Sequence, residues 1–418
     1  MRTPVQDYLK KMLDVARPNI SGSRASYIPE LRDATPDLLG MAICTIDGNI
    51  YSAGDDQEMF TIQSISKPFM YALALKDRGL DTVMETVGTE PSGEDFNELS
   101  LEGDTNRPMN PMINAGAIAV NQLINGEEST TEDRIALILE FMSDLAGREL
   151  EIDHGLCESE FAGADRNLSL AHMLRSYGII NDTAHDAVFS YVQQCSILVN
   201  VRDLAVMGAT LANGGVQPRT GKQVLKPEIC RQVQSVMVSA GMYNGAGQWL
   251  FDVGIPAKSG VSGGILGTLP GQLGIATFSP RLDSKGNSVR GVRVFEQLSK
   301  DMGLHLMATE PFGGDALREI TSDGYTTTIH VQGTLNFSAA EELLWEVLPR
   351  ELPNERIIVD LTEVRRARVA GSRILLDGIT ALEESGADVA VYDPHFVLKT
   401  HEREDGTDIE IVDNLPVR

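Results

Sequence analysis

The chain has few cysteines, fewer basic than acidic residues, and no long apolar run. Four cysteines are spread over 418 residues without a C-x-x-C pair, which argues against a zinc ribbon, a thioredoxin-like motif and a disulfide framework. The 35 Lys and Arg stand against 60 Asp and Glu, a formal net charge of -25. This balance argues against nucleic acid and anionic membrane surfaces as partners, and it favours solubility. No run of ~18 apolar residues predicts a membrane span.

Targeting and metal signals are also missing. The N-terminal stretch MRTPVQDYLKKMLDVARPN carries charges throughout, unlike the apolar core of a signal peptide. We therefore expect a cytoplasmic protein. The seven histidines show no H-x-x-x-H or comparable ligand spacing, and no metal or other cofactor is predicted.

Hydrophobic periodicity divides the first three quarters of the chain into strands around a helical middle. Two strands, 39–46 and 49–53, flank Asp47-Gly48, a strong hairpin signal. Further strands are predicted at 271–279 and 288–294. Helices are predicted at 5–16, 64–78, 131–145, 168–177 and 201–212. This order predicts an α/β (α+β) domain over 1–307, in which a mixed sheet joins the first and last strands and a helical lobe is inserted between them.

The pattern changes after a linker predicted at 308–315, which contains Pro311-Phe312-Gly313-Gly314. Strands at 325–332, 356–361 and 389–392 alternate with helices at 339–348 and 372–384. Such alternation over about 100 residues is typical of a small α/β domain, here 316–418.

The most informative motif is Ser64-Ile65-Ser66-Lys67, the single S-x-x-K of the chain. Residues three apart share a helix face, so a lysine amine lies beside a serine hydroxyl. Serine needs such a neighbour to take its proton, and lysine needs a partly buried site to lose its own. Pro68 is tolerated only in about the first helical turn, which predicts a helix start near Ser64. Free N–H groups there can hold an oxyanion.

A second motif, Lys258-Ser259-Gly260, is the single K-[ST]-G of the chain. An early S-x-x-K followed by a late K-[ST]-G is the motif pair of penicillin-binding proteins and class A β-lactamases. Each motif alone can arise by chance; their order and spacing argue against coincidence.

Longer motifs over roughly residues 5–307 resemble the serine-dependent glutaminase family, whose fold is β-lactamase-like. They read FTIQSISK at 60–67, EPSG at 90–93, RPMNPMINAGAI at 107–118, QCS at 194–196, GMY at 241–243 and KSGVSGG at 258–264. The resemblance implies hydrolysis of L-glutamine to L-glutamate and ammonia without a cofactor. The third β-lactamase motif is absent as written, which weakens a β-lactamase assignment but not this one.

The resemblance also implies a role for each matched position. Ser64 corresponds to the nucleophile, Lys67 to its base and Tyr191 to a proton-transfer partner, while the N–H groups of Ser64 and Val261 correspond to the oxyanion hole. The implied substrate-binding set is Ser64, Asn114, Glu160, Asn167, Tyr191, Tyr243, Lys258 and Val261. Residue chemistry agrees, because a buried carboxylate suits the substrate ammonium and Asn and Tyr donors suit its carboxylate. Without the resemblance, the same residues are ordinary surface acids, helix caps and core aromatics.

The last domain resembles the STAS family on weaker, strand-like segments at 329–335, 357–362 and 364–371. In phosphorylated relatives a serine precedes the glycine at the helix start; here Ala370 precedes Gly371, and Ser372 follows it. Arg365, Arg366 and Arg368 form a basic patch in an acidic chain, which favours an acidic protein partner or a neighbouring subunit.

Two alternatives stay open at this point. One is another S-x-x-K hydrolase acting on β-lactams or peptides; the other is a non-catalytic glutamine sensor, which lacks a nucleophile or its lysine in the simplest case. The prediction is a glutaminase with a Ser–Lys acyl-enzyme mechanism, L-glutamine as its small-molecule partner, and a homo-oligomer (dimer or tetramer).

Overall fold

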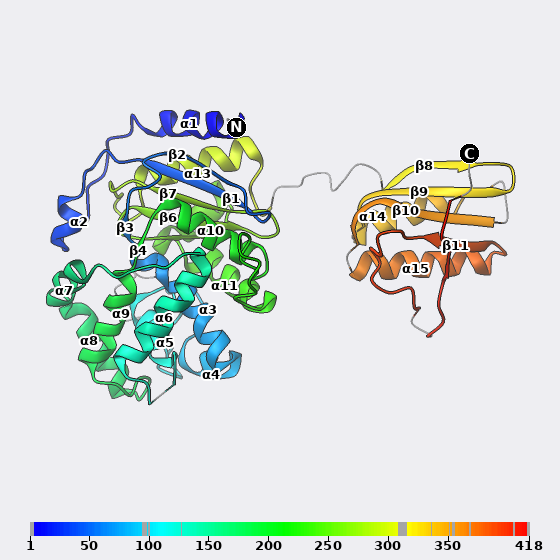
Figure 1. Ribbon diagram of the computed structural model, residues 1–418. Helices are drawn as coiled ribbons and strands as arrows, with labels where there is room; N and C mark the ends of the chain where they lie inside the picture. Colours follow the sequence, from blue (N-terminus) through cyan, green and yellow to red (C-terminus); the bar gives the residue numbers. More distant parts are fainter. Residues whose placement is uncertain are drawn as a thin grey trace. The chain divides into compact units, whose positions relative to one another are not determined.

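The computed structural model describes residues 4–93, 98, 101–126, 128–307, 316–335, 337–350, 352, 356–367, 369–403 and 406–415. The chain forms two compact units, Met1–Ala308 and Thr309–Arg418, here called the N-terminal and C-terminal units (Figure 1). The linker predicted at 308–315 lies outside the described residues. Within the described part, no helix has both the length and the apolar character required to cross a membrane.

The N-terminal unit is built on a five-stranded sheet with the order β2-β1-β7-β6-β5. The predicted hairpin is confirmed as β1 (Gly40–Thr45) and β2 (Ile50–Gly54), and the first and last strands are neighbours as expected, since β1 pairs with β7 (Leu273–Phe278). β6 (Gly264–Leu269) and β5 (Ala257–Ser259) complete the sheet. Every pairing is antiparallel, so the prediction of mixed strand directions is wrong for this sheet.

Helices cover both faces of this sheet. On one face, α1 (Pro4–Ala16) and α13 (Val289–Met302) pack through Leu9, Phe295 and Leu298 against Met41 and Ile275. On the other face lies α10 (Val201–Ala212). α10 approaches so closely that a Cβ at Gly274 of β7 would overlap its backbone.

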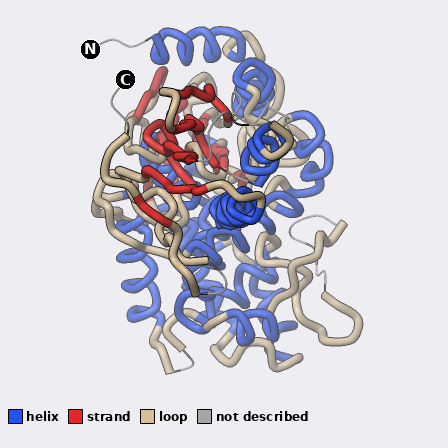
Figure 2. The backbone as a smooth tube through the Cα atoms, turned by 90° about the vertical axis from the view of Figure 1, so that its right-hand side faces the viewer, coloured by secondary structure: helices blue, strands red, loops and turns tan. Residues whose placement is uncertain are grey.

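The inserted lobe is helical and lies below the sheet of this unit in Figure 1, and at the bottom of Figure 2 the backbone is drawn as helices and loops. Its central helix is α3 (Lys67–Arg78), whose residues from Lys67 to Leu75 are all buried. A two-stranded ladder links β3 (Phe60–Thr61) to β4 (Leu198–Val199). The remaining α-helices of the N-terminal unit, in the lobe and outside it, are α2 (Pro29–Asp33), α4 (Leu80–Thr86), α5 (Asn114–Leu123), α6 (Thr131–Ala146), α7 (His154–Ala162), α8 (Asp165–Ser176), α9 (Ala184–Cys195), α11 (Pro227–Ala240) and α12 (Ala246–Asp252).

Two local predictions need correction. The segment 288–294 is the start of α13 and not a strand, because the Ser288 side chain caps the helix by accepting from Gly291 N, and the apolar spacing of Val294, Phe295 and Leu298 is helical. The helix predicted from Ser64 begins at Lys67, and Ser64 lies in the preceding 3₁₀ turn, η1 (Gln63–Ser66). Pro68 occupies the first turn of α3, as expected.

The C-terminal unit confirms the predicted alternation of strands and helices and adds an edge strand at each side. Its sheet has the order β12-β11-β10-β9-β8, in which β8–β9 is antiparallel and the other pairs are parallel. The elements are β8 (Leu317–Ser322), β9 (Thr326–Leu335), α14 (Phe337–Val347), β10 (Arg356–Ala367), α15 (Val369–Glu384), β11 (Asp388–Tyr392) and β12 (Glu410–Ile411). Arg368 of the predicted basic patch and the side chain of Ala370 lie outside the described residues.

Candidate active site

Ser64 lies in a tight turn whose backbone is held in an uncommon conformation. Gln63, directly before it, has φ +50°, a backbone angle that few residues other than glycine adopt unless their surroundings stabilise it. Ser66 Oγ donates to the Gln63 carbonyl at 2.8 Å and accepts from Gln194 Nε2 at 3.1 Å. Gln194 in turn accepts from Asn121 Nδ2 at 2.8 Å. A buried polar chain from three elements therefore fixes the turn that carries Ser64.

The surroundings of Lys67 alter its acid–base behaviour. Its side chain is buried, and Nζ donates to Asn114 Oδ1 at 2.7 Å and to the Met112 carbonyl at 3.2 Å. Both acceptors are neutral, so burial lowers the pKa of Lys67 to about 8, against smaller opposing effects of Cys195 and Glu160. An amine with this pKa is partly unprotonated near neutral pH and can accept a proton.

Asn114 joins three of the predicted residues. Its Oδ1 accepts from Lys67 and also from the Tyr191 hydroxyl at 3.4 Å, while its Nδ2 donates to Asn167 Oδ1 at 3.0 Å. Asn114 is the first residue of α5, and its side chain faces the site. The residue before it, Ile113, caps the helix without a side-chain hydrogen bond. Burial raises the pKa of Tyr191 well above its ordinary value, so the phenolate is disfavoured. The hydroxyl can therefore donate its proton only when it receives a proton from a neighbouring group.

Glu160 approaches the site from α7. It accepts from Gln63 Nε2 at 3.0 Å, and burial raises the pKa of its carboxyl to about 7, against lesser effects of Gln63 and Lys67. A carboxyl in this state gains from a ligand cation, which favours its ionised form.

The last group of predicted site residues comprises Lys258, Tyr243 and Val261. Lys258 Nζ lies 4.1 Å from the centroid of the Tyr243 ring and donates to the Ser259 carbonyl at 2.6 Å. Tyr243, at φ +53°, donates its hydroxyl to the same carbonyl at 3.1 Å and is also hydrogen-bonded to Ser64. Burial lowers the pKa of Lys258 well below its ordinary value. Val261 follows β5 in the turn closed by the Gly260–Gly264 bond.

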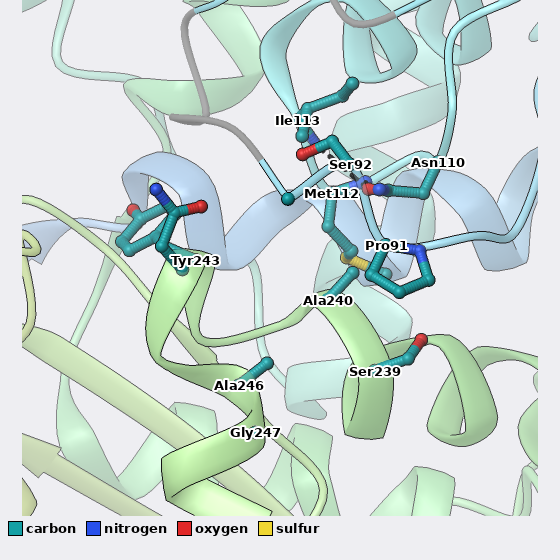
Figure 3. Close-up of a pocket in the computed structure, with 12 residues that line it drawn as sticks. Pro91, Ser92, Asn110, Met112, Ile113, Ser239, Ala240, Tyr243, Ala246 and Gly247 are labelled. Carbon is teal, nitrogen blue, oxygen red and sulfur yellow. Dashed lines mark hydrogen bonds between the residues drawn. The ribbon is translucent and has the colours of Figure 1, made fainter. Parts of the chain in front are cut away.

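Tyr243 lines a cavity of about 180 Å³. Figure 3 shows Tyr243 on one side of it and Ser92, Asn110, Met112 and Ile113 on the other. Met112, whose carbonyl accepts from Lys67, connects the cavity wall to the buried amine.

Two residues near the site were not predicted. Gln63 lies in the FTIQSISK motif, but the sequence predicts no role for its side chain. Its hydrogen bond to Glu160 spans 97 positions, which no local pattern reveals. Tyr27, with 61% of its surface exposed, lies within electrostatic reach of Glu160 and Tyr243. Its neighbour Ile28 packs in one cluster with Val261. Neither composition nor spacing distinguishes Tyr27 from an ordinary surface tyrosine.

The fold and the site together define a β-lactamase-like protein in which Ser64 and Lys67 of the S-x-x-K motif are both buried. A sequence model of the glutaminase family, described as Glutaminase, matches residues 22–307. The chain belongs to the glutaminase family and is an enzyme of that family.

Relatives extend the similarity over both units. The chain is 57% identical to a glutaminase of Corynebacterium efficiens over 98% of this chain and 97% of that protein. It is 59% identical to a glutaminase of Corynebacterium glutamicum over 97% of this chain and 98% of that protein. A crystal structure of Mglu, 49% identical, has TM-score 0.86 and covers 95% of this chain and 100% of that one. A probable glutaminase, ybaS, 40% identical, has TM-score 0.69 over 72% of this chain and 99% of its own.

Proposed function

We propose that this enzyme hydrolyses the side-chain amide of L-glutamine to L-glutamate and ammonia through an acyl-enzyme on Ser64. Relatives named glutaminase and a crystal structure of Mglu in its glutamate form, with TM-score 0.85 and 46% identity, support this substrate and product. The observation that carries the mechanism is the burial of Lys67 against two neutral acceptors, which lowers its pKa to about 8.

The first half-reaction begins with attack of Ser64 Oγ on the amide carbon while unprotonated Lys67 takes the hydroxyl proton. The N–H groups of Ser64 and Val261 stabilise the oxyanion. Tyr191, which shares the Asn114 acceptor with Lys67, gives a proton to the departing ammonia and recovers one from Lys67. Water then hydrolyses the γ-glutamyl ester by the reverse proton path, and glutamate leaves.

Substrate recognition follows from charge. Glu160 binds the ammonium, which keeps its carboxyl ionised. Asn114, Asn167 and Tyr243 offer neutral donors to the carboxylate. Lys258, buried beneath the Tyr243 ring, adds a further donor on that side, and Tyr27 covers the ammonium end beside Glu160.

The test is ammonia release by purified protein from glutamine, from asparagine and from no amide, together with turnover of a chromogenic β-lactam. Release from glutamine that is lost in Ser64→Ala supports the proposal. Acylation by the β-lactam with no release from glutamine would instead support the other class of S-x-x-K hydrolase. Glutamine binding without turnover in the unaltered chain would support a sensor.

A further inference from the structure

A second cluster of reactive side chains lies in the C-terminal unit. His330 on β9 stands between two residues of the adjacent strands. Its Nδ1 lies 2.8 Å from Asp360 Oδ2 on β10, and its Nε2 lies 3.0 Å from Thr321 Oγ1 on β8. Strand pairing brings them together, since His330 is directly opposite Asp360 and Thr321 is in the strand paired on the other side.

The carboxylate of this cluster is buried and oriented. Asp360 is 6% exposed, and its Oδ1 accepts from the backbone N–H of Thr362 at 2.9 Å and from the Thr362 hydroxyl at 2.5 Å. The second oxygen, Oδ2, is thereby directed at the imidazole. In the tautomer whose Nδ1 hydrogen is donated to the Asp360 carboxylate, Nε2 accepts from the Thr321 hydroxyl.

These side chains belong to the face of the sheet that the helices leave open. The alternate residues Ile329, Val359 and Leu361 pack in the apolar core with α14 and α15. On the opposite face, Thr321, His330, Asp360 and Thr362 line a cavity of about 710 Å³. A partly buried His–Asp pair gains little stability over apolar residues of similar size, so fold stability does not account for this arrangement.

We propose that Thr321, His330 and Asp360 form a second, acyl-transfer site. A nucleophile bonded to a base that a third group orients is the arrangement such chemistry requires. Thr321 Oγ1 attacks the carbonyl carbon of an ester while its proton moves to His330 Nε2. The same proton then goes to the departing alkoxide, which leaves as an alcohol. Water, deprotonated by His330, hydrolyses the threonyl ester and releases the acid.

The cavity lining selects the substrate class. Four carboxylates line it against one guanidinium, that of Arg318, together with His330; the acids are Glu319, Asp323, Asp360 and Glu363. Like charges are costly in such a site. The site therefore takes neutral or cationic esters of small acids and excludes anionic ones, in contrast to the zwitterionic amide proposed for Ser64.

The experiment uses the full-length chain carrying Ser64→Ala, so that the first proposed nucleophile cannot contribute. The probe is p-nitrophenyl acetate, a neutral ester. We expect release of p-nitrophenol and an acetyl group mapped to Thr321 by peptide mass spectrometry. Thr321→Val and His330→Gln should each lower the rate by about 100-fold, Asp360→Asn should also lower it, and Thr321→Ser should retain it.

The control is Thr334→Val, which removes an exposed hydroxyl of the same sheet outside the cavity lining and should leave the rate unchanged. Circular dichroism, and chemical denaturation that follows the unfolding of the C-terminal unit, report whether each variant is folded. Equal rates in folded Thr321→Val and Thr334→Val, or acetyl groups found at other residues and not at Thr321, would overturn the proposal.

Discussion

The two sheets of this chain differ in how many faces are covered, and the difference decides where chemistry can occur. In the N-terminal unit every residue of β6 and β7 is buried, because helices lie on both faces. Reactive groups there occur mainly beside the sheet, in the η1 turn and the lobe, and Lys258 lies on the edge strand β5. In the C-terminal unit the helices cover one face, and β8 has no fully buried residue. Polar side chains can therefore face a cavity directly from the strands.

The N-terminal unit, whose sheet is covered on both faces, and the C-terminal unit, whose sheet has one open face, also differ in how their charged groups are held. They are called the covered unit and the open unit below. Lys67 and Lys258 are buried and bonded to neutral acceptors, and both have lowered pKa values. One buried acid of the C-terminal unit, Asp360, is paired with an imidazole and a hydroxyl. Burial without a countercharge prepares a base, whereas a paired acid holds a neighbouring imidazole in position.

The sharpest test of this comparison is the nucleophile of the covered unit. Ser64→Ala should lower kcat for glutamine by roughly 10⁴-fold or more, because the covalent step is lost, with the fold unchanged. Ser66→Ala should be far milder, since it removes the hydrogen bonds to the Gln63 carbonyl and to Gln194 but no reacting atom. A buried polar group left without its partner costs about 1–3 kcal/mol, which corresponds to a loss of roughly 5- to 150-fold. Steady-state ammonia assays separate the two, and an active Ser64→Ala with an inactive Ser66→Ala would mean that the motif register is wrong.

Packing should differ between the sheets as much as exposure does. Gly274→Ala places a methyl group against the backbone of α10 and should lower the free energy of unfolding by about 1–3 kcal/mol. Thr326→Val in the open sheet should change it by less than about 0.5 kcal/mol. Chemical denaturation that follows the unfolding of each unit gives both values. An unaffected Gly274→Ala would show that α10 can move away from β7 at little cost.

Substrate choice tests whether the covered site is rigid. Asparagine is one methylene shorter, so with its ammonium on Glu160 the amide carbon falls about 1 Å or more from Ser64. Misplacement on that scale costs ~100-fold in kcat/KM. Comparable kcat/KM values for glutamine and asparagine would refute an anchored ammonium near a fixed nucleophile.

The pH profile tests the buried groups. Lys67, with pKa about 8, must be unprotonated to accept a proton, and Glu160, with pKa about 7, must be ionised to bind the ammonium. Both active forms are lost as the pH falls, so kcat/KM should decline by at least roughly 10-fold from pH 8 to pH 6. Measured kcat/KM that is flat over this range would place the pKa of both groups lower.

The smallest effect is expected from removing the open unit. All residues proposed for glutamine hydrolysis lie before 307, so a chain ending at Met307 should stay folded and keep its kcat within about twofold. Size-exclusion chromatography and ammonia release measure both properties. An insoluble or inactive fragment would show that the C-terminal unit completes the core or an oligomer.

Local sequence determined the elements that depend on neighbours in the chain. Asp47-Gly48 specified the hairpin, because few other dipeptides adopt its turn without strain. Pro68 limited the start of α3 to the region around Ser64, since proline fits only the first helical turn. The S-x-x-K spacing placed a hydroxyl and an amine within one turn, and the longer motifs pointed to the family. The strand 288–294 was mistaken because its β-branched residues favour extended backbone locally, whereas burial of Val294, Phe295 and Leu298 selects the helix.

Tertiary structure alone decided what these residues can do. The pKa of Lys67 depends on burial and on acceptors from Asn114 and Met112, which lie more than forty positions away. The contact of Gln63 with Glu160 and the approach of Tyr27 are likewise non-local. The strand directions of the first sheet, and the face on which His330 meets Asp360 and Thr321, follow from chain topology. The physical reason is common to all of them: desolvation, hydrogen-bond geometry and strand pairing are set by segments distant in sequence, which local propensity does not encode.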